Sequence, residues 1–213
     1  MARARVHQHV NPLAKYFREL PIEPLDLEDV FDDPGLPLHL DIGCARGRFI
    51  LEKARIEKGW NFLGVEIREP LVDDANRIRD DENLGNLYYE FCNATFDLEV
   101  LLENAPDGIL KLVTIQFPDP WFKKRHAKRR MVKGSMVRTI LRHLADDGTV
   151  FLQTDVDFIA EEMLEVFLET DEFLSEELRE NPLPVKTERE IAVENKDLPV
   201  YRYLLRKGRF TRS

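Results

Sequence analysis

Short runs of apolar, β-rich residues alternate with segments of helical periodicity between about residues 36 and 170. The runs are bounded by turn residues and predict five strands, at 36–42, 61–66, 86–91, 111–117 and 149–154. The segments between and after them place apolar side chains at intervals of three and four residues and predict helices, at 46–58, 70–81, 96–104, 133–145 and 157–170. This alternation predicts an α/β fold in which a mostly parallel sheet is connected by helical crossovers.

The pattern changes after residue 180. Three prolines, Pro182, Pro184 and Pro199, precede a final β-rich run at 200–206. We interpret this run as part of an antiparallel hairpin at an edge of the sheet. Residues 1–35 are expected to form a basic N-terminal segment and lead-in, and residues 36–213 a single domain.

The charge of the chain is unevenly distributed. A net charge of -9 argues against a nucleic-acid partner, but 16 of the 31 Lys and Arg residues lie in three blocks that contain no Asp or Glu, at 1–18, 123–133 and 202–213. Of the 213 residues, 43% are hydrophobic, which is enough for one sizeable core and excludes a disordered chain. Basic blocks on an acidic body are compatible with a polyanionic ligand held at one place.

The cysteines and the apolar runs bear on where the protein works. Cys44 and Cys92 form neither a CxxC pair nor a Cys/His cluster with metal-ligand spacing. No run approaches the roughly 20 apolar residues that a membrane span requires, and the N-terminus has no signal-peptide pattern. We therefore expect a cytoplasmic protein with reduced thiols, no metal and no membrane association.

A glycine-containing turn follows the first predicted strand, in the run Asp41-Ile-Gly-Cys-Ala-Arg-Gly47. Glycines at such a strand–turn–helix junction allow a ligand to approach the backbone, but G-x-G-x-x-G is missing, so a dinucleotide site is poorly supported. Glu66 closes the second strand, where a carboxylate can accept hydrogen bonds from both ribose hydroxyls. These features favour an adenosine-type cofactor without a pyrophosphate. The alternative is that the glycines only form a turn and that Glu66 is a solvated strand end.

Two further strand ends carry polar residues. Asn93 follows the third strand and could bind an adenine edge, which alone is weak evidence. The fourth strand leads into Pro118-Asp119-Pro120-Trp121, where two prolines hold the carboxylate rigidly beside an aromatic surface able to support a base. The seven cations of 123–133 follow, and we favour phosphate contact for them. The alternative is a capping Asp, a core Trp and a solvated basic face.

Five motifs together resemble the tRNA (guanine-N7)-methyltransferase family, and the similarity covers roughly residues 36–206. They are Asp-Ile-Gly-x-x-x-Gly at 41–47, Pro-Asp-Pro-Trp-x-Lys-Lys-Arg-His-x-Lys-Arg-Arg at 118–130, Thr154-Asp155, Met163-Leu-Glu165 and Thr187-Glu-Arg-Glu190. The leader from Arg5 to Leu13 also resembles short bacterial members. The resemblance implies a Rossmann-like class I methyltransferase fold with helices on both faces of the sheet and an antiparallel C-terminal hairpin.

The resemblance also implies an activity: transfer of a methyl group from S-adenosylmethionine to N7 of the variable-loop guanine, position 46, of tRNA. Asp119 would be the catalytic carboxylate and would also contact the cofactor. The other implied cofactor-binding residues are Asp41, Gly43, Gly47, Glu66, Asn93 and Ala94, and the implied substrate-binding residues are Lys123, Asp155, Thr187, Glu188, Arg189 and Glu190. The compact length favours a monomer or homodimer without an obligatory second subunit.

Three positions depart from the family's pattern. Ala45 replaces a loop glycine, which is tolerable if its φ angle stays negative. Asn93 stands where Asp is common, so the acceptor is kept but the charge is lost. The ending Tyr201-Arg-Tyr203 lacks the tryptophan of many relatives.

Two other functional classes compete with this interpretation. The first is an amino-methyltransferase acting on adenine or a small molecule, for which the basic block would be unnecessary. The second is an RNA-binding module that lacks catalysis and retains a vestigial cofactor fold. Retained binding of S-adenosylmethionine separates the enzymes from the binding module.

Overall fold

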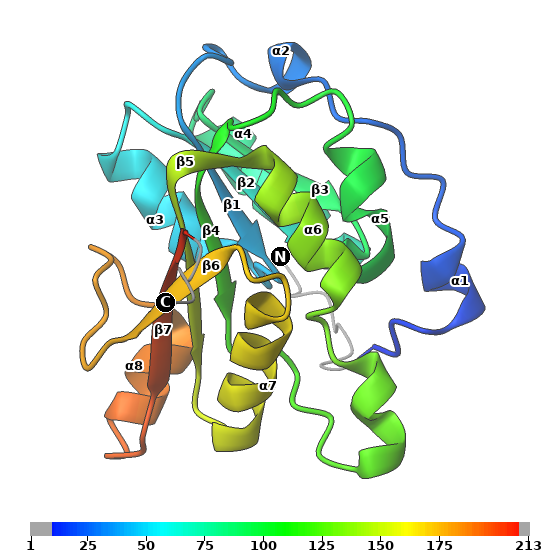
Figure 1. Cartoon of the computed structure of the whole chain (residues 1–213). Helices are drawn as coiled ribbons and strands as arrows, with labels where there is room; N and C mark the ends of the chain where they lie inside the picture. Colours follow the sequence, from blue (N-terminus) through cyan, green and yellow to red (C-terminus); the bar gives the residue numbers. More distant parts are fainter. Residues whose placement is uncertain (1–9, 209–213) are drawn as a thin grey trace.

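The computed structural model describes residues 10–208 and is built around a seven-stranded sheet (Figure 1). The strand order is β3-β2-β1-β4-β5-β7-β6. The strand bounds are β1 Leu38–Ile42, β2 Asn61–Glu66, β3 Leu87–Phe91, β4 Leu110–Gln116, β5 Leu144–Thr154, β6 Phe173–Glu177 and β7 Tyr201–Lys207.

The first five strands are parallel, and β7 is antiparallel to both β5 and β6. Ile42 at the end of β1 is level with Val65 on β2 and with Ile115 on β4. The carboxyl ends of these strands therefore lie at one edge of the sheet. From β1 the chain builds the sheet outward first through β2 and β3 on one side and then through β4 and β5 on the other, so the direction of winding switches between β1 and β4. Open α/β sheets bind ligands at this point.

Helices cover both faces of the sheet. In Figure 1, α6 and α7 lie in front of it, and α3 and α4 lie on the other side. The helix bounds are α1 Lys15–Arg18, α2 Leu27–Val30, α3 Arg48–Ile56, α4 Glu69–Asp81, α5 Ala94–Leu101, the 3-10 helix η1 Lys124–Arg129, α6 Gly134–His143, α7 Asp157–Leu168 and α8 Glu188–Glu194.

Two apolar clusters hold these layers together. Leu38, Leu40 and Ile42 of β1 point to the side packed by α5, α6 and α7. On the opposite side, Phe62 and Leu87 pack against α3 and α4. Because successive strand residues face opposite sides, burial on both faces gives the nearly continuous apolar runs seen in the sequence.

The predicted α/β class, the five parallel strands and the antiparallel C-terminal pairing are confirmed. One partner in that pairing was not predicted: β7 pairs with β6, which precedes α8, so a long segment that includes a helix joins the two strands. In addition, β5 begins at Leu144, earlier than predicted. No helix within residues 10–208 has the length and apolar composition needed to cross a membrane.

Candidate active site

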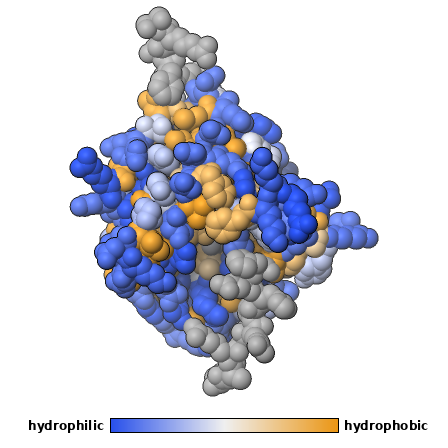
Figure 2. All heavy atoms as spheres, turned by 90° about the horizontal axis from the view of Figure 1, so that it is seen from below, coloured by the Kyte–Doolittle hydropathy of each residue, from blue (hydrophilic) through white to orange (hydrophobic). Residues whose placement is uncertain are grey.

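A cavity of about 740 Å³ opens at the carboxyl edge of the sheet. Figure 2 shows this side of the molecule, where apolar residues gather near the middle of a mostly hydrophilic surface. Ten of the thirteen predicted site residues line the cavity: Asp41, Gly43, Glu66, Asn93, Ala94, Asp119, Asp155, Thr187, Glu188 and Arg189. The other three, Gly47, Lys123 and Glu190, do not line it.

The turn after β1 requires its two glycines. Gly43 has a φ angle of 80°, and a Cβ there would lie 2.9 Å from the Met131 Cε. Gly47 has a φ angle of 69°, and a Cβ there would lie 2.2 Å from the Tyr89 ring. The Tyr89 hydroxyl donates to the Gly47 carbonyl at 2.8 Å. Gly47 therefore allows the positive φ angle at the start of α3 and the close contact with Tyr89, and it lies outside the cavity lining.

Ala45 does not meet the condition of a negative φ angle under which an alanine is tolerable in this loop. Its φ angle is 53°, in the left-handed region where a side chain is disfavoured. Its backbone N–H donates to the Glu66 Oε2 at 3.0 Å. This hydrogen bond requires the N–H to face β2, so the turn keeps an unfavourable backbone conformation at this position.

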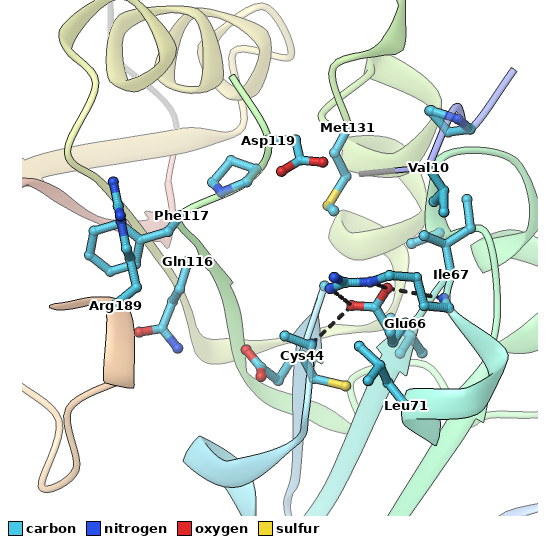
Figure 3. Close-up of a pocket in the computed structure, with 18 of the residues that line it drawn as sticks. Val10, Cys44, Glu66, Ile67, Leu71, Gln116, Phe117, Asp119, Met131 and Arg189 are labelled. Atoms are coloured by element: carbon cyan, nitrogen blue, oxygen red, sulfur yellow. Dashed lines mark hydrogen bonds and ion pairs between the residues drawn. The ribbon is translucent and has the colours of Figure 1, made fainter. Parts of the chain in front are cut away.

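Glu66 lies at the end of β2 and is 3% exposed. Besides the Ala45 N–H, it accepts from three donors of one residue: the Arg68 backbone N–H at 3.0 Å, Nε at 2.9 Å and Nη2 at 3.0 Å (Figure 3). The hydrogen bonds from Arg68 to Glu66 raise the pKa of Arg68. Sequence reasoning missed Arg68, although a cation two residues beyond a strand-end carboxylate is a recognisable signal.

Asp41 lies at the end of β1 and is 4% exposed. The Thr114 hydroxyl donates to its Oδ1 at 2.6 Å, and the same Oγ1 lies 2.9 Å from the His39 Nε2. Since the hydroxyl proton is used on Asp41, the Nε2 of His39 must donate to the Thr114 Oγ1. Burial raises the pKa of Asp41 to about 6, against the opposing effect of the Thr114 hydrogen bond, and burial lowers the pKa of His39.

Asn93 immediately precedes α5, but its side chain does not cap that helix. Its Nδ2 instead donates to the Pro12 carbonyl at 3.0 Å and the Phe17 carbonyl at 2.8 Å. Val10 and Pro12 line the cavity, so this amide holds the described part of the N-terminal segment at the site. An Asp at this position has no proton to donate when ionised, which gives the departure at Asn93 a physical reason.

The segment around Asp119 has an unusual backbone. Phe117 and Trp121 have φ angles of 50° and 42°, which bulky side chains rarely adopt, and Pro118 and Pro120 lie between them. The Phe117 N–H donates to the Gln153 carbonyl at 2.8 Å, which ties the segment to β5. Strained positions of this kind cost roughly 1–3 kcal/mol each and cluster at functional sites. The fold thus holds the Asp119 carboxylate at the cavity (Figure 3).

The basic block after Trp121 divides into two parts. Arg129 lies over the Trp121 ring at 4.9 Å, and Arg130 pairs with Glu162 and donates to the Pro120 carbonyl at 3.1 Å. The cations of this block that are exposed and make no ion pair within residues 10–208 are Lys123, Lys124, Arg125 and Lys128. These four side chains are the most exposed cations of the block and are available to an external anion, while Arg129 also lines the cavity.

The C-terminal basic block differs from the expectation of a third anion-binding block. Arg202 is 5% exposed and pairs with Glu190 at 2.8 Å and with Glu194 at 2.9 Å. Arg206 pairs with Glu176, and Lys207 lies 3.8 Å from Asp146. The basic residues Arg3, Arg5, Arg209 and Arg212 lie outside the described residues. In the described part, then, acidic neighbours neutralise this block.

The segment at the start of α8 borders the cavity opposite Glu66. The Thr187 hydroxyl caps α8 by accepting from the Glu190 N–H at 3.1 Å. Arg189 pairs with Asp155, and Glu188 pairs with Arg48. Glu190 is fully buried. Within residues 10–208, no group of three or more His, Cys, Asp or Glu side chains is placed to hold a metal ion.

The doubly wound sheet, with β7 antiparallel between β5 and β6, and the cavity at its carboxyl edge are typical of the class I methyltransferase fold. A family model described as "Putative methyltransferase" matches residues 36–203. Among solved structures, precorrin-6y C5,15-methyltransferase from Geobacter metallireducens has a TM-score of 0.54 at 14% identity, over 81% of this chain and 80% of that chain. A similarity at this level of identity supports the fold alone.

Curated relatives are much more similar in sequence. A tRNA (guanine-N(7)-)-methyltransferase from Trichormus variabilis is 54% identical over 95% of this chain and 96% of its own length. One from Synechococcus elongatus is 56% identical over 96% of this chain and 97% of its own length. The chain belongs to the tRNA (guanine-N(7)-)-methyltransferase family.

Proposed function

We propose that this protein transfers the methyl group of S-adenosylmethionine to N7 of the variable-loop guanine of tRNA. The proposal rests mainly on the position of the Asp119 carboxylate. Strained backbone holds it in the same cavity as Asp41 and Glu66, and exposed cations follow it in the sequence. The curated relatives are named tRNA (guanine-N(7)-)-methyltransferases, which supports methyl transfer to guanine N7 of tRNA. The cavity of about 740 Å³ is within the size range of roughly 300–1,000 Å³ typical of ligand pockets.

The residues at the strand ends fit the adenosine part of the cofactor. Glu66 is proposed to accept from the two ribose hydroxyls, which would replace side-chain donors of Arg68. Asn93 and Ala94 are proposed to contact the adenine, because both Nδ2 hydrogen bonds of Asn93 go to the N-terminal segment and its Oδ1 remains as an acceptor. Gly43 would allow close approach of the ligand, and Gly47 supports the turn from behind.

The reaction needs alignment more than a base. The bound cofactor supplies an electrophilic methyl group on a sulfonium, and guanine N7 has a free lone pair, so no proton has to be removed before transfer. Holding the reacting atoms in line can contribute roughly 7–11 kcal/mol. Asp119 is proposed to accept from the N1–H and N2–H of guanine, which orients the base and stabilises the positive charge that develops on it.

The substrate side of the cavity is proposed to receive an extruded base. Guanine N7 faces the deep and narrow major groove of A-form RNA, so the target must be in a loop or leave its stack. Asp155, Thr187, Glu188 and Arg189 border this side, and Lys123 stands at the start of the exposed cations. Because Glu190 is fully buried, we assign it a role in holding α8 instead of direct contact with RNA.

We further propose that residues 36–213 act as one domain and that tRNA is bound without an obligatory partner subunit. The continuous sheet from β1 to β7 supports the first point. Cys44 and Cys92 are both buried and unpaired, which supports a reducing compartment, the cytoplasm.

The activity is tested by incubating the protein with unmodified total tRNA and methyl-labelled S-adenosylmethionine, followed by nucleotide mapping. We expect the label in 7-methylguanosine at one position of the variable loop. Label in N6-methyladenosine would identify the amino-methyltransferase alternative instead. Cofactor binding without labelled RNA, across tRNA from several sources, would contradict the proposal.

Affinity for tRNA is expected to depend on the exposed cations at the start of η1. Alanine at Lys123, Lys124 and Arg125 should weaken binding and flatten the slope of log K against log salt by roughly 0.7–0.9 for each phosphate that the variant no longer neutralises. Filter binding at several salt concentrations measures both quantities. Alanine at the exposed residues Lys58, Arg77 and Lys196 gives a control with the same change of net charge. Equal slopes for the two triple variants would assign the block to a solvated face.

A further inference from the structure

Phe122 is an exposed aromatic side chain at the cavity that has no role in the function proposed above. It is 70% exposed, the highest value among the large hydrophobic side chains within residues 10–208. Among the exposed side chains of this kind in the same part of the chain, it alone lines the cavity. Single exposed apolar residues are common on protein surfaces, so its position beside the site, and not its exposure alone, requires an explanation.

The backbone and one neighbouring ring determine where Phe122 points. Trp121 precedes it with a φ angle of 42°, in the left-handed region. Phe158 at the start of α7 meets the Phe122 ring edge to face, with centroids 5.9 Å apart and planes at 66°. Arg130 in turn lies over the Phe158 ring, 5.0 Å from its centroid, and pairs with Glu162. The contact with Phe158 therefore orients the Phe122 ring and leaves most of it open to solvent.

The ring is followed directly by positive charge. Lys123, Lys124, Arg125 and Lys128 are exposed, and none of them makes an ion pair within residues 10–208. An open aromatic face beside cations is the arrangement by which proteins bind single-stranded nucleic acid, because phosphates contact the cations and bases stack on the ring. The combination therefore points to unpaired nucleotides as the occupant of this surface.

The position of the ring relative to Asp119 indicates which nucleotide it meets. Asp119, which we propose holds the target guanine, and Trp121 are both partly buried, whereas Phe122 is exposed and adjoins the cations. A guanine bound at Asp119 has left its stack, which uncovers a face of each neighbouring base. An aromatic ring outside the guanine position can cover such a face and restore part of the lost stacking.

We propose that Phe122 stacks on the base of a nucleotide adjacent to the target guanine and thereby stabilises the RNA with the guanine extruded. This inference rests on the proposed function and adds a residue that positions the substrate for it. Phe158 supports the ring from the protein side, and the exposed cations of 123–128 hold the phosphates of the same stretch of RNA. Because every base has a flat face, the contact tolerates differences in sequence between tRNAs.

The first measurement is tRNA binding by filter assay at several salt concentrations. Phe122→Ala should lower the affinity about fivefold to a hundredfold, while the slope of log K against log salt stays the same because no phosphate contact is lost. Phe122→Tyr keeps the ring and should stay within about twofold of wild type. Phe96→Ala is the matched control and should leave the affinity unchanged, because Phe96 is an exposed ring on α5 that does not line the cavity.

The second measurement identifies the base that the ring covers. The RNA is tRNA assembled from synthetic pieces, with an abasic nucleotide on either the 5′ or the 3′ side of the target guanine. With one of these two RNAs, wild type and Phe122→Ala should bind equally well, because the ring has no base left to cover. With the other RNA, the variant should show its full loss of affinity.

The remaining outcomes would overturn the inference or the function it rests on. Wild-type affinity in Phe122→Ala, or a flattened salt slope, would overturn the stacking role. A full loss with both abasic RNAs would place the ring elsewhere, including on the target guanine, and would overturn the assignment to a neighbouring base. Self-association of the wild type that Phe122→Ala abolishes would show that the ring docks a second copy of the chain instead. If the wild-type protein methylated no tRNA at guanine N7, the proposed function itself would fail.

Discussion

Replacing Asp119 with Asn is expected to lower the single-turnover rate of methyl transfer to tRNA by about 10²–10³-fold. The substitution keeps the shape of the side chain but puts an amide donor against the N1–H or N2–H donors of guanine. The contact thereby changes from attractive to repulsive. Because the positive charge on the purine develops during transfer, the loss should appear mainly in the rate of the bound complex and less in cofactor affinity.

The measurement is a rapid-quench assay with enzyme in excess over tRNA. The thermal midpoint should stay close to wild type in the variant, and cofactor affinity by calorimetry should change much less than the rate. Asp73→Asn is the matched control, because Asp73 is exposed on α4 and does not line the cavity. If Asp119→Asn kept a near-wild-type rate, the carboxylate would be a turn residue and the catalytic assignment would be withdrawn.

The fold could be predicted from the sequence wherever burial of side chains imposed a periodic pattern of apolar residues. β1 and β2 are buried along their whole length, and their apolar runs predicted them almost to the residue. β6 was missed because only Phe173 of its five residues is buried, so the strand has no alternating pattern. Its place in the sheet depends on pairing with β7, which is far away in the sequence.

The site could be predicted from the sequence where the order of the strands alone brings residues together. Asp41, Glu66, Asn93 and Asp119 each lie at or just beyond the end of a parallel strand, so their meeting at one edge follows from the strand order. Side-chain contacts between segments far apart in the sequence could not be predicted in this way. Arg202 is buried against Glu190, and Arg206 and Lys207 lie near acidic side chains, whereas the sequence had suggested an anion-binding block.

Backbone conformation was the second feature that the sequence alone could not predict. Residue type alone did not show which φ angle Ala45 adopts. Its φ angle is left-handed, and its N–H donates to Glu66 in that conformation. The change from Asp to Asn at position 93 looked like a loss of charge. The structure shows that its Nδ2 donates to the carbonyls of Pro12 and Phe17, two contacts that the sequence does not reveal.

Asp41 is expected to weaken the fold and strengthen cofactor binding, and both effects should depend on pH. Burial raises its pKa from 3.8 to about 6 in the folded protein. A carboxyl whose pKa is raised by folding contributes stability at low pH, and this contribution disappears as the pH rises through about 6. At pH 8 the buried charge therefore costs stability, by an amount on the order of 3 kcal/mol for a rise of about two in pKa.

Asp41→Asn should accordingly raise the free energy of unfolding at pH 8, and the gain over wild type should shrink as the pH falls to 5, because the wild-type carboxyl becomes neutral there. The affinity of the wild type for S-adenosylhomocysteine should decrease below pH 6, because protonation removes the negative charge that Asp41 presents to the cavity. The variant should bind this ligand weakly across the whole range. Denaturant titrations and calorimetry at pH 5 and pH 8 measure the two effects. A gain in stability of the same size at both pH values would show that the charge on Asp41 is not what the fold opposes.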